Sequence, residues 1–308
     1  LQPSCTILFV GAKGKMESEK VPKASYEIIR LDIAGFNRSN LWKNISLPFK
    51  LWKSFMQAKK VIQQFKPTVA VGVGGYASFP LLFMAQRIKI ATIIQEQNSY
   101  AGKSNKVLGK KAKAICVAYD QMEKFFPEHA IIKTGNPVRA SISQNKITQQ
   151  EAKKSFFFSS TDPVVFVFGG SLGAKSINTA MMLHVQQLVD AGLQVIWQTG
   201  ATYYQQALAS VKEIDNKVKV FEFIHDMDIA YAAADIIVSR SGASSIAELC
   251  IVAKPVIFVP YPFASEDHQT HNAMALVKHN AAMLVKDQDV AVDLIPKTIQ
   301  LFKNELQR

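Results

Sequence analysis

The chain has 308 residues, 48% hydrophobic and 19% charged, with a formal net charge of +12; this is the composition of a folded globular protein and excludes a disordered or fibrous chain. Its three cysteines (Cys5, Cys116 and Cys250) lie far apart without nearby histidines, which argues against a zinc site and favours a reducing compartment. No stretch approaches the roughly 18 apolar residues of a membrane span, and the first residues lack the pattern of a signal peptide.

Short apolar, β-branched runs alternate with longer helical patterns along the chain. Such runs are typical of strands buried on both faces, and helical crossovers between them imply parallel sheets. The predicted strands are 6–10, 27–33, 69–73, 92–94 and 114–117, then 164–168, 195–197, 235–238 and 256–259. A polar segment, 141–150, separates the two series just after the turn Gly135-Asn136-Pro137-Val138-Arg139. The sequence therefore predicts two doubly wound α/β domains, residues 1–138 and 139–308, with ligands at the carboxyl ends of the strands.

Residues 45–65 predict a helix with two separate apolar stripes at about 100° per residue. One stripe, expected to pack on the sheet, contains Leu51, Phe55, Ala58, Ile62 and Phe65. The other contains Ile45, Phe49, Trp52 and Met56, flanked by Lys50, Lys53, Lys59 and Lys60. An apolar patch ringed by lysines is typical of a membrane-interface site. The alternative is that a neighbouring helix covers the second stripe.

The charge is unevenly distributed along the chain. Residues 1–150 contain 23 Lys and Arg against 8 Asp and Glu, whereas the remainder contains 13 against 16. This asymmetry predicts that the first half faces an anionic partner: a membrane, an anionic lipid or a nucleic acid.

Two glycine loops follow predicted strands and lead into helices, one in each half. The first is Gly72-Val73-Gly74-Gly75-Tyr76-Ala77-Ser78-Phe79-Pro80, and the polar run Gln95-Glu96-Gln97-Asn98 ends the next strand. The second is Gly169-Gly170-Ser171-Leu172-Gly173-Ala174. Glycines allow backbone to approach a ligand closely, and free N–H groups at a helix start attract phosphate. A tight turn without a ligand is the alternative, and GGSxG differs from the dinucleotide motif GxGxxG, which disfavours a nicotinamide cofactor.

Two further segments of the second half carry polar groups at the expected edge of the sheet. In Ser239-Arg240-Ser241-Gly242-Ala243-Ser244-Ser245-Ile246-Ala247-Glu248, the carboxylate falls on the second turn of a helix, where it could accept ribose hydroxyls or simply favour the helix macrodipole. In Glu266-Asp267-His268-Gln269-Thr270-His271-Asn272, the amides could bind sugar hydroxyls. Because no cysteine or HExxH accompanies the two histidines, no metal site is expected.

The motifs GVGGYxSxP, EQNxxAGxxNK, GNPVR, GGSxGAxxIN, FIxDM, RSGA…E and DHQxxNA occur in one order across nearly the whole chain. In this order the chain resembles the MurG family of bacterial transferases. The resemblance implies a GT-B fold, two Rossmann-like domains facing a central cleft. It also implies an inverting transfer of N-acetylglucosamine from UDP-N-acetylglucosamine to the 4-hydroxyl of undecaprenyl-pyrophosphoryl-muramyl-pentapeptide, a step of peptidoglycan synthesis, with no cofactor. The expected location is the cytoplasmic face of the bacterial inner membrane, where the protein would bind an anionic surface peripherally.

The resemblance also implies roles for individual residues. Ser171 and Arg139 would meet the diphosphate, Glu248 the ribose, the backbone of Ile224 the uracil, and Gln269 with Asn98 the sugar. The alternative for Arg139 is an interdomain salt bridge. The remaining expected donor-site residues are Asn178, Ala243, Ser244, Ser245, Ile246 and Ala247. Gly74, Gly75 and Tyr76 would lie on the acceptor side, and Glu96, the carboxylate among the motifs of the first half, is the candidate base. Independently of the resemblance, the pattern of residues 45–65 predicts that Ile45, Phe49, Trp52, Lys50 and Lys53 contact the membrane.

The chain departs from the family pattern at several places. The family's opening strand and glycine loop with a histidine, and its closing helix, are not recognisable here. Leu172 stands where glutamine is common, and Gln95 where histidine is common. The missing opening loop affects the acceptor and base assignments more than the donor site.

Two other functions remain open from the residues. One is another UDP-sugar-dependent GT-B enzyme, such as a glycolipid glycosyltransferase or a UDP-sugar epimerase. The other is a non-catalytic nucleic-acid-binding protein, which the basic first half would favour. Against it, the basic residues are mostly lysine and do not interleave with aromatic side chains, so no nucleic-acid partner is expected.

Overall fold

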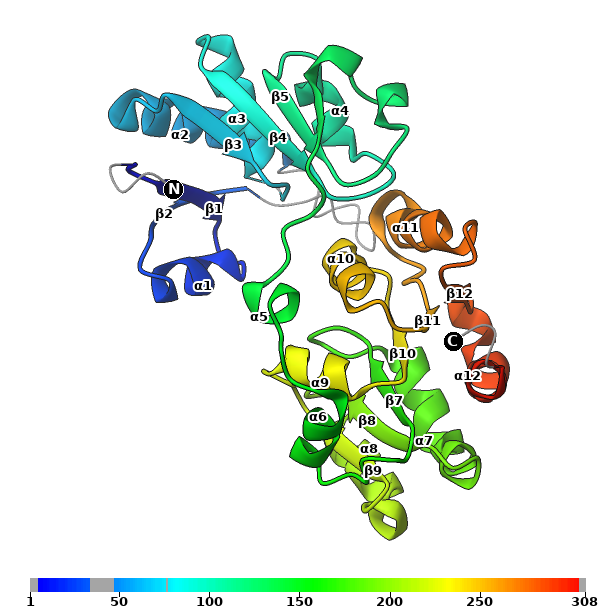
Figure 1. Ribbon diagram of the computed structural model, residues 1–308. Coiled ribbons are helices and arrows are strands. Elements are labelled where there is room, and N and C mark those ends of the chain that lie inside the picture. The colour runs from blue at the N-terminus through cyan, green and yellow to red at the C-terminus, as the bar shows by residue number, and fades with distance from the viewer. Residues whose placement is uncertain (1–4, 34–46, 76, 305–308) are drawn as a thin grey trace. The chain divides into compact units, whose positions relative to one another are not determined.

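The computed structural model describes residues 5–33, 47–75 and 77–304. The chain forms two compact units (Figure 1), one made of Leu1–Gln97 and Ala101–Gly135, the other of Asn98–Tyr100 and Asn136–Arg308. The main change of unit falls between Gly135 and Asn136, inside the GNPVR turn, close to the predicted boundary at 138/139.

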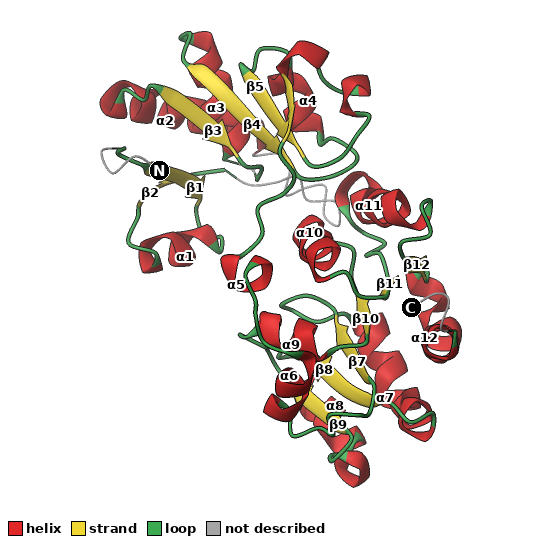
Figure 2. Ribbon diagram, in the orientation of Figure 1, coloured by secondary structure: helices red, strands yellow, loops and turns green. Residues whose placement is uncertain are grey.

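The first unit contains two parallel sheets with helical crossovers (Figure 2). A two-stranded sheet pairs β1 (Leu8–Ala12) with β2 (Glu27–Leu31). A four-stranded sheet has the order β3 (Val69–Gly72), β4 (Ala91–Glu96), β5 (Ala114–Val117) and β6 (Ile131–Lys133). Its longer helices are α1 (Glu17–Lys23), α2 (Leu47–Phe65), α3 (Ser78–Arg87) and α4 (Lys103–Gly109).

The second unit is built on one six-stranded parallel sheet in the order β12-β11-β10-β7-β8-β9. The strands are β7 (Val164–Phe168), β8 (Gln194–Gln198), β9 (Val218–Phe221), β10 (Ile236–Ser239), β11 (Val256–Phe258) and β12 (Met283–Leu284). The helices are α5 (Ala140–Ser143), α6 (Gln149–Ser155), α7 (Lys175–Asp190), α8 (Tyr204–Ser210), α9 (Met227–Ala233), α10 (Ala243–Val252), α11 (His268–Val277) and α12 (Val290–Lys303). From β7 the chain proceeds outward through β8 and β9, then restarts at β10 on the other side. Strand order therefore reverses between β7 and β10, and a ligand crevice is expected at their carboxyl ends.

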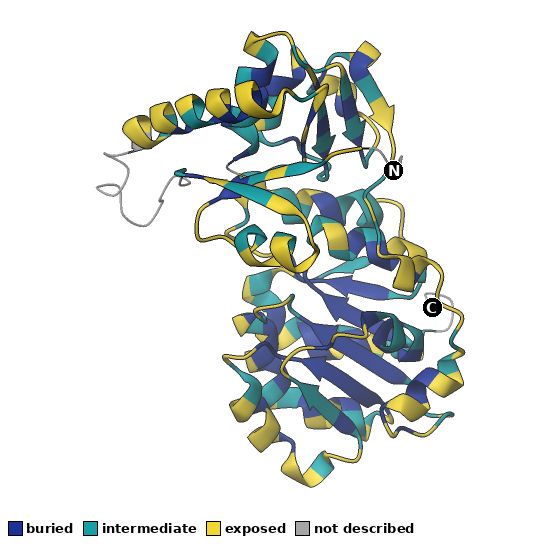
Figure 3. Ribbon diagram, turned by 90° about the vertical axis from the view of Figure 1, so that its left-hand side faces the viewer, coloured by how far each residue is buried: buried dark blue, intermediate teal, exposed yellow. Residues whose placement is uncertain are grey.

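Helices cover both faces of this sheet (Figure 3), so its four central strands, β7, β8, β10 and β11, are buried throughout. Successive side chains of β7 point to opposite faces: Val165 and Val167 join one core cluster, whereas Val164, Phe166 and Phe168 join the other. Every residue of β7 and β8 is buried, as the continuous apolar run of β7 predicts.

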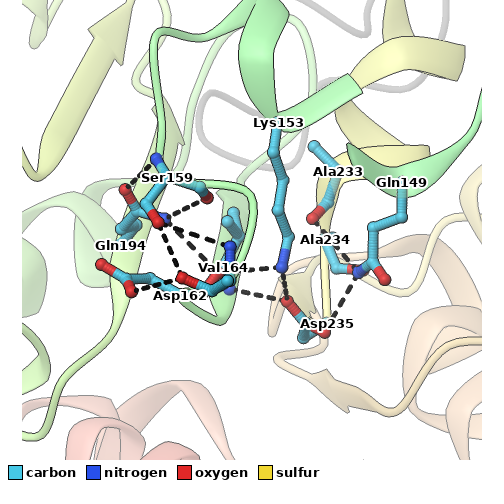
Figure 4. A network of polar contacts seen from close by, with 10 residues as sticks. Gln149, Lys153, Ser159, Asp162, Val164, Gln194, Ala233, Ala234 and Asp235 are labelled. Carbon is cyan, nitrogen blue, oxygen red and sulfur yellow. Dashed lines mark hydrogen bonds and ion pairs between the residues drawn. The ribbon is translucent and has the colours of Figure 1, made fainter. Parts of the chain in front are cut away.

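A buried polar network ties α6 to the amino-terminal ends of β7 and β10 (Figure 4). Lys153, only 4% exposed, donates to the Asp162 carbonyl at 2.8 Å and pairs with Asp235 Oδ2 at 3.0 Å. Asp235 also accepts the Val164 N–H at 2.8 Å and the Gln149 amide at 3.0 Å. These bonds satisfy a buried lysine at the end of the sheet opposite to the expected crevice, so the network is structural.

Among the described residues, no helix combines the length and apolarity required to cross a membrane. Nor does the described part of the chain bring three or more His, Cys, Asp or Glu side chains together in a way that could hold a metal ion.

Candidate functional site

A cavity of about 900 Å³ lies in the second unit, beside the carboxyl ends of β7 and β10. Its wall combines the glycine loop after β7, the first residues of α7 and α10, the segment after β11 and the turn before α12. Of the residues expected from the sequence to bind a donor, Ser171, Ser245 and Gln269 line this cavity. The reversal of strand order therefore coincides with a cavity of ligand size.

The glycine loop is folded tightly against the end of β8. Gly173 has φ +77°, and a Cβ at this position would lie 1.8 Å from the Thr199 carbonyl oxygen, so only glycine fits. This close approach leaves Ser171 exposed at the cavity wall and directs the chain into α7. The cap residue Ala174 makes no side-chain hydrogen bond, and the first turn of α7 has no acidic residue. The amino terminus of α7 is thus suited to an anionic ligand.

Asn178, an expected donor-site residue, occupies a structural position instead. It is 1% exposed, its amide donates to the Thr199 carbonyl at 2.8 Å, and its oxygen accepts from the Trp197 indole at 3.0 Å. The side chain therefore braces α7 against β8 and does not line the cavity.

Gln198 connects the glycine loop to the segment that contains Ile224. Its amide donates to the Gly170 carbonyl at 3.1 Å, and its Oε1 accepts the Ile224 N–H at 2.8 Å. The backbone of Ile224 was expected to meet the uracil of the donor. Its N–H is already hydrogen-bonded to Gln198 within the unit.

Glu248 is held by two partners and is not the solvated helix-terminal carboxylate that the sequence left open. It is 8% exposed; Arg139 Nε and Nη2 donate to its Oε1 at 3.1 and 2.9 Å, and the Tyr231 hydroxyl donates to its Oε2 at 2.9 Å. Burial, together with the charge of Glu248, raises the pKa of Tyr231 well above its usual range, so this hydroxyl stays a donor. The structure thus joins Arg139 to Glu248 in an ion pair, whereas the family resemblance implied separate ligand groups for the two side chains.

The remaining donor-site residues expected at the start of α10 are divided between surface and core. Ser245 lines the cavity, Ser244 is exposed, and Ile246 is 3% exposed and packs in the core. Ala243 and Ala247 are half-buried and do not line the cavity.

Gln269 is positioned at the start of α11 by two hydrogen bonds. Its Oε1 accepts the Tyr261 N–H at 2.9 Å, and its carbonyl accepts from the Ser241 hydroxyl at 2.9 Å. In the same helix, Asn272 is fully buried, accepts the Ser99 N–H at 2.8 Å and donates to Asn98 Oδ1 at 3.0 Å. Asn98 is therefore held by α11, although the cavity described above does not include it.

Among the cavity residues to which the sequence assigned no role are Arg240, Ser176 and Asp287. Arg240 lies within the RSGA motif, so its position could have marked it. Asp287 lies in no motif, and only the fold brings it to Arg240.

Glu96, the candidate base of the first unit, is 2% exposed. Its Oε2 accepts the Gly102 N–H at 3.0 Å and the Asn105 amide at 2.9 Å. These bonds satisfy N–H groups at the start of α4, so the carboxylate has a structural role there. Burial and these bonds favour a structural role over that of a general base, which has to reach a substrate hydroxyl.

The acceptor-side glycine loop of the first unit has left-handed backbone at Gly74 (φ +92°) and Gly75 (φ +80°). The Ser78 hydroxyl donates to the Gly74 carbonyl, and the Gln97 amide donates to the Val73 carbonyl at 2.8 Å. Tyr76 lies outside the described residues.

The second stripe of α2 is exposed, with Phe49 at 67%, Trp52 at 60% and Met56 at 50%. The opposite stripe is buried at Ala58 and Ile62, as expected, although Phe65 is 36% exposed. No described element therefore covers the second stripe. Lys50 is exposed, and Lys53 pairs with Asp32 at 2.7 Å. Ile45 lies outside the described residues.

Comparisons with known proteins agree with this architecture. Residues 3–117 match the glycosyltransferase family 28 N-terminal domain and residues 164–308 its C-terminal domain. Two relatives, from Bacteroides fragilis and Cytophaga hutchinsonii, are each named UDP-N-acetylglucosamine--N-acetylmuramyl-(pentapeptide) pyrophosphoryl-undecaprenol N-acetylglucosamine transferase. Each is 50% identical to this chain; the match covers 99% and 98% of the chain, respectively, and 81% of each relative.

Among solved structures, the chain resembles the MurG of Acinetobacter baumannii with a TM-score of 0.76 and 27% identity, over 99% of this chain and 84% of that one. A UDP-N-acetylglucosamine 2-epimerase from Neisseria meningitidis, 16% identical with a TM-score of 0.63 over 98% of this chain and 84% of that one, shares the fold alone. The predicted GT-B fold is thereby confirmed. The chain belongs to the MurG family of glycosyltransferases.

Proposed function

We propose that this protein transfers N-acetylglucosamine from UDP-N-acetylglucosamine to a polyprenyl-pyrophosphate-linked muramyl-pentapeptide. One observation carries the proposal. A cavity with an anion-attracting helix start occupies the switch point of the second unit, in a chain 50% identical over nearly its whole length to relatives named for this transfer.

The donor is assigned to the second unit. Its diphosphate would lie at the amino terminus of α7 beside Ser171, whose exposed hydroxyl can donate a further hydrogen bond. The backbone dipoles there stabilise the negative charge that develops on the leaving UDP. Gln269, fixed by Tyr261 and Ser241, would bind sugar hydroxyls.

Glu248 and Arg139 would act on the nucleoside as one unit. The ribose hydroxyls would share Glu248 with Tyr231 and Arg139, and the half-exposed Arg139 side chain would reach toward the diphosphate. Because Gln198 holds the N–H of Ile224, the uracil would meet the carbonyl side of this backbone.

The acceptor is assigned to the first unit, whose loop has left-handed backbone at Gly74 and Gly75, a conformation found in backbone sites that bind anions such as pyrophosphate. The transfer would invert the anomeric carbon, as the 4-hydroxyl of the acceptor attacks and UDP leaves. The hydroxyl proton needs a base; the burial of Glu96 and its bonds to the loop 96–102 and α4 favour a structural role for this carboxylate over that of the base.

We also propose that the first unit binds the cytoplasmic leaflet peripherally. The support is the exposed stripe Phe49, Trp52 and Met56, with Lys50, Lys59 and Lys60 exposed on the same helix. Apolar insertion and lysine attraction to anionic lipid act together in such surfaces.

The test is a transfer assay with radiolabelled UDP-N-acetylglucosamine and a short-chain analogue of the lipid-linked acceptor. Labelled product of inverted stereochemistry is expected without added metal. Binding of UDP without any transfer would contradict the reaction, and conversion of the donor to its 2-epimer would favour the epimerase alternative. A salt-sensitive shift of oligonucleotides without UDP binding would favour the nucleic-acid alternative.

A further inference from the structure

A carboxylate lines the cavity proposed to receive a diphosphate. Asp287 lies in the turn that follows β12 and precedes α12, and its side chain is 24% exposed. A negative charge there repels an anionic ligand, so its presence needs a physical reason.

Its partner is Arg240, which follows β10 and whose side chain is 11% exposed. Arg240 Nη1 donates to Asp287 Oδ1 at 2.6 Å and to the carbonyls of Val259 and Pro260 at 3.0 and 2.9 Å. The guanidinium thus remains anchored to the backbone after β11 even without the carboxylate. Asp287 mainly neutralises its charge.

Ser176, in the first turn of α7, completes the cluster. Its hydroxyl donates to Asp287 Oδ1 at 2.5 Å and accepts from Arg240 Nη2 at 3.1 Å. Asp287 therefore accepts from both the arginine and the serine, and it ties the start of α7 at the cavity wall to the turn before α12. The N–H and O–H donors of this cluster are thus bound to Asp287, to Ser176 and to the carbonyls of Val259 and Pro260.

We propose that Asp287 is a positioning residue that sets the charge of the donor cavity by neutralising Arg240, so that the nucleoside diphosphate binds less tightly and UDP leaves after each transfer. This inference rests on the proposed binding of a UDP-sugar in the second unit. Arg240 then holds the segments of the cavity wall together through its hydrogen bonds, while the start of α7 and Ser171 bind the diphosphate.

Asp287→Asn removes the charge but keeps an oxygen acceptor of the same size for Ser176 and Arg240. Because Arg240 would then be uncompensated, UDP affinity should rise by roughly threefold to tenfold at low salt. The gain should shrink at high salt. A purely structural role for Asp287 predicts the opposite direction, since a loosened wall binds its ligand less well.

The experiment is calorimetry with UDP on the full chain at low and high salt. It compares the parent with Asp287→Asn and with Asp287→Ser, which also removes the charge and serves if the first variant does not fold. Asp293→Asn is the matched control, because it changes the net charge equally but lies on α12, pairs with Lys297 and does not line the cavity.

Tighter UDP binding by the folded Asp287 variants, lost at high salt and absent in Asp293→Asn, is the expected result. In the transfer assay, product inhibition by UDP should strengthen by the same factor. Equal or weaker UDP binding by folded Asp287 variants overturns the inference. A parent that binds no UDP overturns the proposed function instead, so the two failures are distinguishable.

Discussion

Arg139 and Glu248 form a charge-assisted pair in the second unit, with Arg139 Nε and Nη2 both donating to Glu248 Oε1, at 3.1 and 2.9 Å. The Tyr231 hydroxyl donates to the other carboxylate oxygen. Since Glu248 lies in α10 and Arg139 just before α5, the pair fixes the start of this unit to the helix that follows β10. A ligand that uses Glu248 must therefore share it with two existing donors.

Replacing Glu248 by Ala should weaken UDP binding and also destabilise the fold. Loss of a hydrogen-bonded charge should reduce UDP affinity by about 1.5–3 kcal/mol, and the buried Tyr231 hydroxyl left without its acceptor should cost about 1–3 kcal/mol of stability. Calorimetry and denaturant unfolding measure the two effects. Tyr231→Phe is the control, because it removes the hydroxyl and leaves the Arg139–Glu248 pair. Unchanged UDP affinity in a folded Glu248→Ala variant would contradict the ribose assignment.

Gly173→Ala should disrupt the glycine loop, because its Cβ would overlap the Thr199 carbonyl oxygen. Gly192→Ala is the matched control: its φ is +88°, but nothing lies within 4 Å of the added Cβ. The control carries only backbone strain, on the order of 1–2 kcal/mol. We expect Gly173→Ala to lose UDP binding and more thermal stability than the control. Equal behaviour of the two variants would show that the close approach to Thr199 is not needed.

The fold was predictable because its signals are local. The uninterrupted apolar run of β7 indicates a strand buried on both faces, and the structure confirms its bounds at Val164–Phe168. The strands missed were β6, β9 and β12, which lie away from the centre of their sheets and have only two to four residues each. At the edge of a sheet a strand need not be a continuous apolar run, as the half-buried β9 and β12 show, so its pairing with a neighbour decides its conformation.

The site was predictable only in part, because a motif does not reveal which of its polar residues faces the ligand. Ser171 and Asn178 belong to one motif, yet the first lines the cavity and the second is buried against Trp197. Asp287 joins Arg240 only because β12 lies beside β11. Such pairings depend on tertiary contacts between residues far apart in the chain, and one sequence carries no local signal for them.

Glu96 offers a direct test of structural against catalytic roles. Glu96→Gln keeps one oxygen acceptor for Gly102 and Asn105 but cannot take a proton. If Glu96 only holds α4, kcat should fall less than tenfold, and stability should drop by about 1 kcal/mol. If Glu96 is instead the general base, Glu96→Gln should lower kcat by roughly 10²–10⁴-fold and leave the KM for the donor unchanged. Steady-state kinetics with the lipid-linked acceptor, together with thermal unfolding, separate these outcomes.

The exposed stripe of α2 leads to a prediction about membranes. Fully burying an apolar side chain contributes roughly 1.5–3 kcal/mol, so partial insertion of Phe49, Trp52 and Met56 would contribute a few kcal/mol. Each neighbouring lysine adds about 1 kcal/mol on an anionic surface, screened within a Debye length. Neither contribution alone anchors a protein firmly, so binding should be reversible and should depend on both salt and lipid charge.

The double variant Phe49→Ser and Trp52→Ser should release the protein from anionic liposomes in a flotation assay. Its UDP affinity should stay unchanged, because the donor cavity belongs to the other unit. The matched control is Leu183→Ser with Val292→Ser, which removes two apolar side chains that are 66% and 76% exposed in the second unit. This control should float like the parent. If the α2 variant also floats like the parent at low and moderate salt, the stripe does not bind membranes, and the basic charge of residues 1–150 must serve another anionic partner.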